Sequence, residues 1–123
     1  MVKTSFDQSN GILHSTFDGN VTIAEIVDYI RATKNNSDYP RELKIITDSE
    51  HAEMNFSPAD LVQIVEENYK SLERYTFIHD AIVVDSPRVT AMTMLYQELV
   101  KTNKYKFEVF SSRETALHWL IEQ

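Results

Sequence analysis

Hydrophobic and polar positions change their spacing several times along the chain, and each change predicts a new element. Residues 2–7 and 12–17 flank Asn10-Gly11, a pair that suits a turn with positive φ, so they predict a β-hairpin. Three later stretches are short, apolar and rich in β-branched or aromatic residues, as expected of buried strands: residues 43–47, 81–84 and 106–110.

Four segments between and after these strands carry apolar residues at helical spacing, and each begins at a capping signal. Thr22 with Glu25, and Ser111 with Glu114, have capping-box spacing, which satisfies free N–H groups at a helix start. Two other helices begin with a capping serine followed by a proline whose fixed φ suits the first turn: Ser57-Pro58 and Ser86-Pro87. The third helix is predicted to run to about Asn103, and its apolar arc is wide enough for a partner or a ligand as well as the core.

The predicted order of elements is ββαβαβαβα. Alternating strands and helices build a mostly parallel sheet with right-handed crossovers and with helices on the sheet faces. We therefore expect a single α/β domain spanning residues 1–123, in which the N-terminal hairpin adds one antiparallel strand. The order of the strands within the sheet is left open.

Composition narrows the possible functions. The 123 residues include 12 basic and 19 acidic side chains, a net charge of −7 that repels nucleic acids and gives no support to association with anionic membranes. The chain has no cysteine, which excludes disulfides, thiolate catalysis, zinc–thiolate sites and iron–sulfur clusters. With only two glycines, it contains neither GxGxxG nor a P-loop, and no cofactor is expected. The N-terminus lacks the apolar centre of a secretory signal, so a cytoplasmic location is expected.

Candidate ligand-binding residues follow the predicted strands, because ligands of open α/β sheets bind at the carboxyl ends of strands. They are Asp48, Ser49, His51, Ser57, Asp85 and Ser86. Ser57 and Ser86 are also interpreted as helix caps, and residues 48–56 as a solvated connection with a possible recognition surface. The acidic residues and His51 could in principle hold a hard metal ion, but they lack calcium-loop spacing, and no metal site is predicted. No nucleophile signature is present, so no catalytic residue is assigned.

The C-terminal part of the sequence resembles the STAS-like group of SpoIIAA-related domains. The match to its ending motif rests on seven residues: Phe110, Ser112, Glu114, Ala116, Leu117, Trp119 and Leu120. The early hairpin, the order of elements and the length extend the resemblance over nearly the whole chain. It implies a non-catalytic regulatory or ligand-binding domain. Anti-sigma-factor antagonists of the group present a phosphorylatable serine in the region that corresponds to Asp48-Ser49, but the Asp-Ser-Ser-Gly pattern is absent here, and neighbouring carboxylates would repel a phosphate.

The sequence is consistent with three functional hypotheses. The first is a cytoplasmic regulatory module that binds a protein partner or a small ligand, and that could form a homodimer. The second is a small-molecule enzyme that uses Asp48, His51 and Asp85 at the strand ends. The third is a carrier of a small apolar ligand or lipid that associates with membranes.

Overall fold

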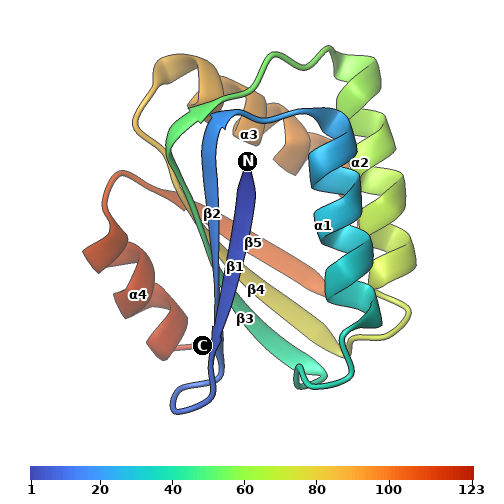
Figure 1. Cartoon of the computed structure of the whole chain (residues 1–123), viewed down its shortest axis with the longest axis vertical. Coiled ribbons are helices and arrows are strands. Elements are labelled where there is room, and N and C mark those ends of the chain that lie inside the picture. The colour runs from blue at the N-terminus through green and yellow to red at the C-terminus, as the bar shows by residue number, and fades with distance from the viewer.

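The computed structural model describes residues 1–123 and contains one five-stranded sheet of order β1-β2-β3-β4-β5 (Figure 1). Strands β1 (Val2–Asp7) and β2 (Ile12–Asn20) form the antiparallel hairpin around Gly11, which has a φ of +72°. Strands β3 (Glu42–Glu53), β4 (Phe77–Val83) and β5 (Tyr105–Phe110) continue the sheet in parallel. The predicted α/β class, the order of elements and the parallel pairing are confirmed.

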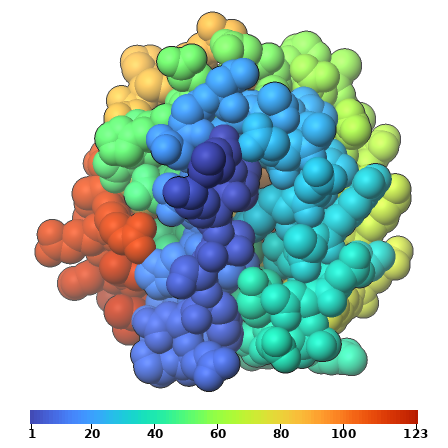
Figure 2. All heavy atoms as spheres, in the orientation of Figure 1, coloured from blue at the N-terminus to red at the C-terminus, as the bar shows by residue number.

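Four helices cover the two faces of the sheet unequally (Figure 1). Helices α1 (Ile23–Asn35), α2 (Pro58–Ser71) and α3 (Pro87–Leu99) pack on one face, whereas α4 (Arg113–Ile121) covers the other alone. In the space-filling view, α1 lies beside the hairpin strands and α4 projects from the opposite side (Figure 2). No helix combines the length and the apolar character needed to span a membrane.

The core is divided by the sheet into a large and a small part. Twelve buried residues, including Ile26, Ile64 and Tyr96, form a cluster beneath α1, α2 and α3. A smaller cluster joins Ala116 and Leu120 of α4 to the other face of the sheet. Because successive side chains of a strand point to opposite faces, each central strand supplies both layers.

The helix starts largely follow the capping signals of the sequence. Ser57 Oγ accepts from the Asp60 N–H at 3.2 Å, and Ser86 Oγ accepts from the Val89 N–H at 3.1 Å. The capping box of Thr22 and Glu25 is also present. The predicted Ser111–Glu114 box is wrong, because α4 begins one residue later and Ser112 is its cap. Helix α3 also ends earlier than predicted, since Val100 already has an extended backbone.

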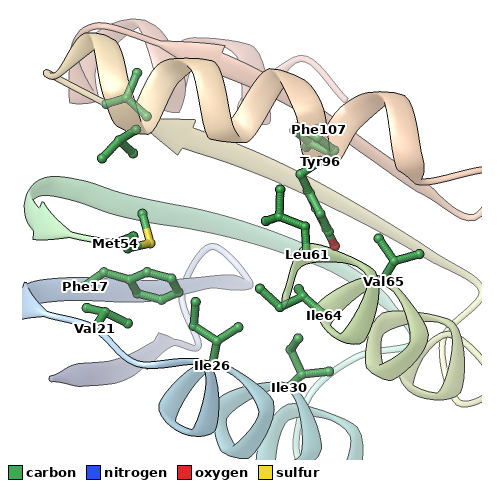
Figure 3. Close-up of a cluster of buried hydrophobic side chains, with 12 residues drawn as sticks. Phe17, Val21, Ile26, Ile30, Met54, Leu61, Ile64, Val65, Tyr96 and Phe107 are labelled. Atoms are coloured by element: carbon green, nitrogen blue, oxygen red, sulfur yellow. The ribbon is translucent and has the colours of Figure 1, made fainter. Parts of the chain in front are cut away.

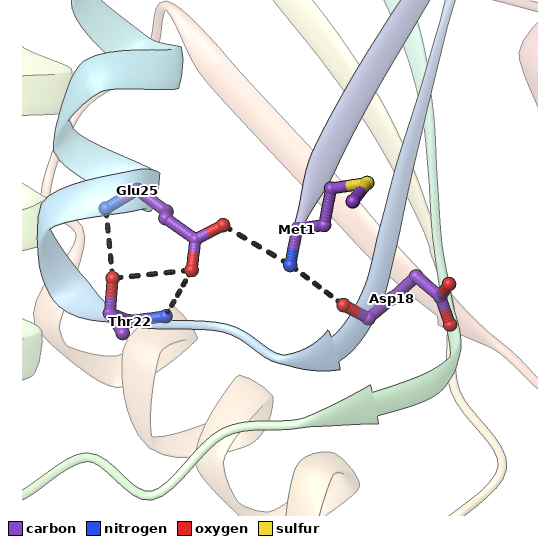
Figure 4. A network of polar contacts seen from close by, with 4 residues as sticks. All are labelled: Met1, Asp18, Thr22 and Glu25. Carbon is purple, nitrogen blue, oxygen red and sulfur yellow. Dashed lines mark hydrogen bonds and ion pairs between the residues drawn. The ribbon is translucent and has the colours of Figure 1, made fainter.

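The capping box at α1 extends into a wider polar network near the N-terminus (Figure 4). Glu25 binds the backbone N–H of Thr22 and also pairs with the Met1 ammonium group at 3.1 Å. That ammonium group donates to the carbonyl oxygen of Asp18 at 2.7 Å. The network fixes the start of β1 between the end of β2 and the start of α1.

The structure corrects part of the prediction of a solvated connector over residues 48–56: residues 48–53 belong to a strand, and only residues 54–56 connect it to α2 without regular secondary structure. Strand β3 continues to Glu53, and its added half pairs with an equally extended β2, from Asp18↔His51 to Asn20↔Glu53. Between Thr16↔Asp48 and Asp18↔His51, β2 advances two residues while β3 advances three, so the added half begins at a β-bulge. Ladder hydrogen bonds therefore hold a polar stretch as a strand, although its composition is typical of a loop.

Candidate functional site

A cavity of about 130 Å³ lies between the sheet and the three helices α1, α2 and α3. It is lined by 21 residues, of which 14 are hydrophobic. Figure 3 shows side chains from α1, α2, α3 and the sheet converging on this region. The apolar wall includes Phe17, Ile26, Ile30, Ile45, Leu61, Ile64 and Met92. Such a lining favours an apolar occupant.

One part of the wall is polar and centres on Asp80 of β4. The carboxyl group accepts two hydrogen bonds, from Thr47 Oγ1 to Oδ1 and from the Tyr105 hydroxyl to Oδ2, each at 2.7 Å. Asp80 is only 7% exposed, and it forms no ion pair with lysine, arginine or histidine. Burial raises the pKa of Asp80 to about 6, although the hydrogen bonds from Tyr105 and Thr47 act in the opposite direction. At neutral pH the cavity wall therefore holds a largely ionised carboxylate without a counterion.

Tyr96 of α3 supplies a second polar group to the cavity wall. Its hydroxyl is buried and has no hydrogen-bond partner. Figure 3 shows the side chain descending from α3 with its oxygen directed toward α2, near Leu61. Burial and the negative charge of Asp80 raise the pKa of Tyr96, so the hydroxyl stays protonated. An unsatisfied buried hydroxyl is costly, so this group is suited to a ligand.

The alternation of β3 and β4 explains why these polar groups face the cavity. Thr47 and Ser49 of β3 line the cavity together with Ile45, while the intervening Ile46 packs on the α4 side. On β4, Asp80 points in the same direction as Ile78 and Ile82. The predicted strand over residues 81–84 began one residue too late to include Asp80. An acidic residue inside the stretch Phe77–Val83 was the signal that could have identified it.

The predicted site residues do not form one site. Only Ser49 lines the cavity, and it is buried, with its hydroxyl donating to the Val83 carbonyl oxygen at 2.6 Å. Asp48 lies on the α4 side, where its carboxylate is 3.6 Å from Arg113 Nη1. His51 and Asp85 are exposed, and neither lines the cavity. Ser57 and Ser86 cap α2 and α3. The structure therefore does not gather Asp48, His51 and Asp85 around the cavity.

A second polar contact lies outside the cavity, on the α4 side of the sheet. His14 Nδ1 is 2.6 Å from a guanidinium nitrogen of Arg113, the residue that also pairs with Asp48. Partial burial, and then the charge of Arg113, lower the pKa of His14, so its neutral form is favoured and accepts from the guanidinium. Across the chain, no group of three histidine, aspartate or glutamate side chains is placed to hold a metal ion. We interpret the contact between His14 and Arg113 as a link between β2 and α4.

No known protein family profile matches the sequence, and no curated protein matches it either. Solved structures do resemble the fold. An uncharacterised DUF3478-family protein from Shewanella loihica with a SpoIIAA-like fold superposes with a TM-score of 0.63 at 15% identity, covering 98% of this chain and 92% of that one. The chain has a SpoIIAA-like fold.

Two further structures support the SpoIIAA-like fold. The anti-sigma factor antagonist SpoIIAA in its unphosphorylated form gives a TM-score of 0.60 at 11% identity over 99% of this chain and 98% of that one. An anti-sigma factor antagonist from Mycobacterium paratuberculosis gives a TM-score of 0.57 at 15% identity, over 98% of this chain and 94% of that one. At these low identities the superpositions show the fold alone. The STAS-like resemblance of the sequence is therefore confirmed for the fold.

Proposed function

We propose that this protein is a non-catalytic, cytoplasmic regulatory module that binds a small and mainly apolar molecule in the cavity between the sheet and helices α1, α2 and α3. The observation that carries the proposal is the cavity itself: a space of about 130 Å³ with a largely hydrophobic lining and a smaller number of polar side chains in its wall. Binding sites for small molecules generally have this composition. An apolar cavity of roughly 150 Å³ is large enough to hold benzene, so the expected ligand has about six non-hydrogen atoms.

A protein partner forms the second half of the proposal. Two of the structurally similar proteins are anti-sigma factor antagonists, which supports a regulatory role through protein contacts. Helix α3 supplies Met92, Thr93 and Tyr96 to the cavity, while Met94 and Leu95 on the same helix are exposed. A ligand that packs beneath α3 would therefore stabilise one position of a helix that also presents an apolar surface. This connection would let ligand binding alter the affinity for a partner.

A phosphoserine switch at Ser49 does not form part of the proposal. The side chain is 1% exposed, and its hydroxyl is already bonded to the carbonyl oxygen of Val83. A kinase could reach it only after β3 had separated from β4. A phosphate in this position would also be buried in a cavity wall that contains no basic side chain to pair with it.

The proposal is tested by filling the cavity. The probe is 1-pentanol, which has six non-hydrogen atoms, and its binding is followed by NMR chemical-shift titration. Ile64→Phe places extra volume in the cavity wall and should weaken binding at least tenfold. Val62→Phe is the matched control, since Val62 lies on the same helix but is 44% exposed and outside the cavity lining. Unchanged binding by a folded Ile64→Phe variant, or shifts that avoid the cavity residues, would contradict the proposal.

A further inference from the structure

We propose that the cavity selects small primary alkylamines, with the ammonium group paired to Asp80 and the alkyl chain held by the apolar wall. This inference rests on the proposed function, because it names the chemical class of the ligand for the same cavity. It starts from two side chains in the cavity wall: the unpaired carboxylate of Asp80 and the unpartnered hydroxyl of Tyr96.

Asp80 retains the capacity to bind a cation after its internal hydrogen bonds have formed. Each carboxylate oxygen accepts one hydrogen bond, from Thr47 or from Tyr105. An ionised carboxylate offers about four lone-pair positions, so about two remain free. None of the ion pairs of the protein includes Asp80. Neutral hydroxyl donors therefore hold the carboxylate in place without neutralising its charge.

The favourable free energy of pairing two charges inside a protein is usually offset by the cost of removing both ions from water. Here the removal of Asp80 from water has already taken place during folding, since its side chain is buried in the free protein. A ligand ammonium group would lose only its own hydration and would gain the attraction of a carboxylate in a region of low dielectric constant. A neutral alcohol of the same size lacks that attraction, and an anionic carboxylate would be repelled.

Tyr96 provides a further acceptor for the same group. An ammonium group has three N–H donors, more than Asp80 alone needs to satisfy. The Tyr96 hydroxyl forms no hydrogen bond within the protein, although the nearby Tyr105 hydroxyl acts to lower its pKa, and it lies near enough to Asp80 for that charge to raise its pKa. The oxygen of Tyr96 can therefore accept a second N–H. An amine would satisfy two groups that the folded chain leaves incompletely bonded.

The rest of the lining limits the ligand to one charge and a short chain. The remaining wall consists mainly of side chains such as Ile26, Ile30 and Leu61, and basic and other acidic residues are absent from it. A second ammonium group would find no second carboxylate in the lining, which otherwise offers only neutral polar groups such as Asn68 and Ser71. The volume of about 130 Å³ corresponds to about six non-hydrogen atoms. The preferred class is therefore a monoamine such as n-pentylamine rather than a diamine.

The experiment compares n-pentylamine, 1-pentanol and 1,5-diaminopentane at pH 8 by NMR titration of the whole chain. We expect n-pentylamine to bind at least tenfold more tightly than 1-pentanol, and the diamine to bind more weakly than the monoamine. Asp80→Asn should reduce the affinity for n-pentylamine at least tenfold. Asp85→Asn removes the same charge from an exposed position outside the cavity and should leave that affinity unchanged.

A measurement on the unmodified protein keeps the test independent of whether Asp80→Asn folds. Lowering the pH from 8 to 5 protonates Asp80, so the affinity for n-pentylamine should fall about tenfold over this range while that for 1-pentanol changes little. Equal affinities for the amine and the alcohol, or an amine affinity that does not change with pH, would overturn the amine proposal while the proposed function stands. Binding of neither ligand would overturn both.

Discussion

The exchange of Asp80 for asparagine tests the central physical feature of this protein, a carboxylate buried without a counterion. Asparagine has nearly the same shape, and it can accept from Tyr105 or Thr47 and donate to the other hydroxyl. It cannot ionise. The variant therefore removes the cost of burying a charge while it preserves the packing and most of the hydrogen bonding.

The expected magnitude follows from the pKa of Asp80. In the unfolded chain the group ionises near its ordinary value of 3.8, whereas in the folded protein its pKa is about 6. Between these values the folded state binds more protons than the unfolded state, so the free energy of unfolding falls as the pH rises. The difference of about two pKa units, at about 1.4 kcal/mol each, makes the ionised carboxylate cost about 3 kcal/mol above pH 6. The cost disappears below the unfolded pKa.

The assay is urea unfolding of the wild-type and Asp80→Asn proteins at several pH values between 4 and 8, followed by circular dichroism and by the fluorescence of Trp119. The free energy of unfolding of Asp80→Asn, relative to that of wild type, should rise by about 2 to 3 kcal/mol from pH 4 to pH 8. Other titrating groups cancel in this difference. Asp85→Asn, which changes an exposed carboxylate, should show almost no trend. A difference between Asp80→Asn and wild type that stays constant with pH would refute the reasoning.

Two further predictions concern the serines that the sequence marked as candidate site residues. Ser57→Ala and Ser86→Ala should each lower the free energy of unfolding by about 1 kcal/mol, because each removes a helix cap, and thermal and urea unfolding measure this loss. Neither substitution should change the affinity for the ligand. A changed affinity would assign these serines to the binding site. Ser49→Ala should lower the free energy of unfolding by about 1 kcal/mol, whereas Ser49→Glu should unfold the protein by burying a carboxylate where the lining has no basic side chain to pair with it. A stably folded Ser49→Glu protein in circular dichroism would show that this position is more accessible than the structure indicates.

The main error of the sequence interpretation has a physical cause. Polar composition predicted a loop over residues 48–56, but backbone hydrogen bonding does not depend on side-chain polarity. The extended β2 supplied a partner for the second half of β3, including His51 and Glu53, and the bulge adjusted the register. Composition alone could not reveal a partner strand that lies more than thirty residues earlier in the chain.

The candidate site was missed for a related reason. Ligands of open α/β sheets usually bind at the strand ends, so the sequence predicted a site at residues such as Asp48 and Asp85. The cavity instead lies over the middle of the sheet, where Asp80, Thr47 and Tyr105 come from three adjacent strands. Tyr96 belongs to the buried cluster beneath α3, and its unpaired hydroxyl became visible only with its neighbours in place.

The sequence by itself determined the order of strands and helices and the class of fold. Periods of two and 3.6 residues, Asn10-Gly11 and the capping serines are local signals, and each acts over a few neighbouring residues. The tertiary structure decided the strand order, the length of β3 and the environment of Asp80. These features depend on which distant segments meet, because a carboxyl group that is ordinary in water acquires its altered pKa and its capacity to select a ligand only when folding removes its solvent.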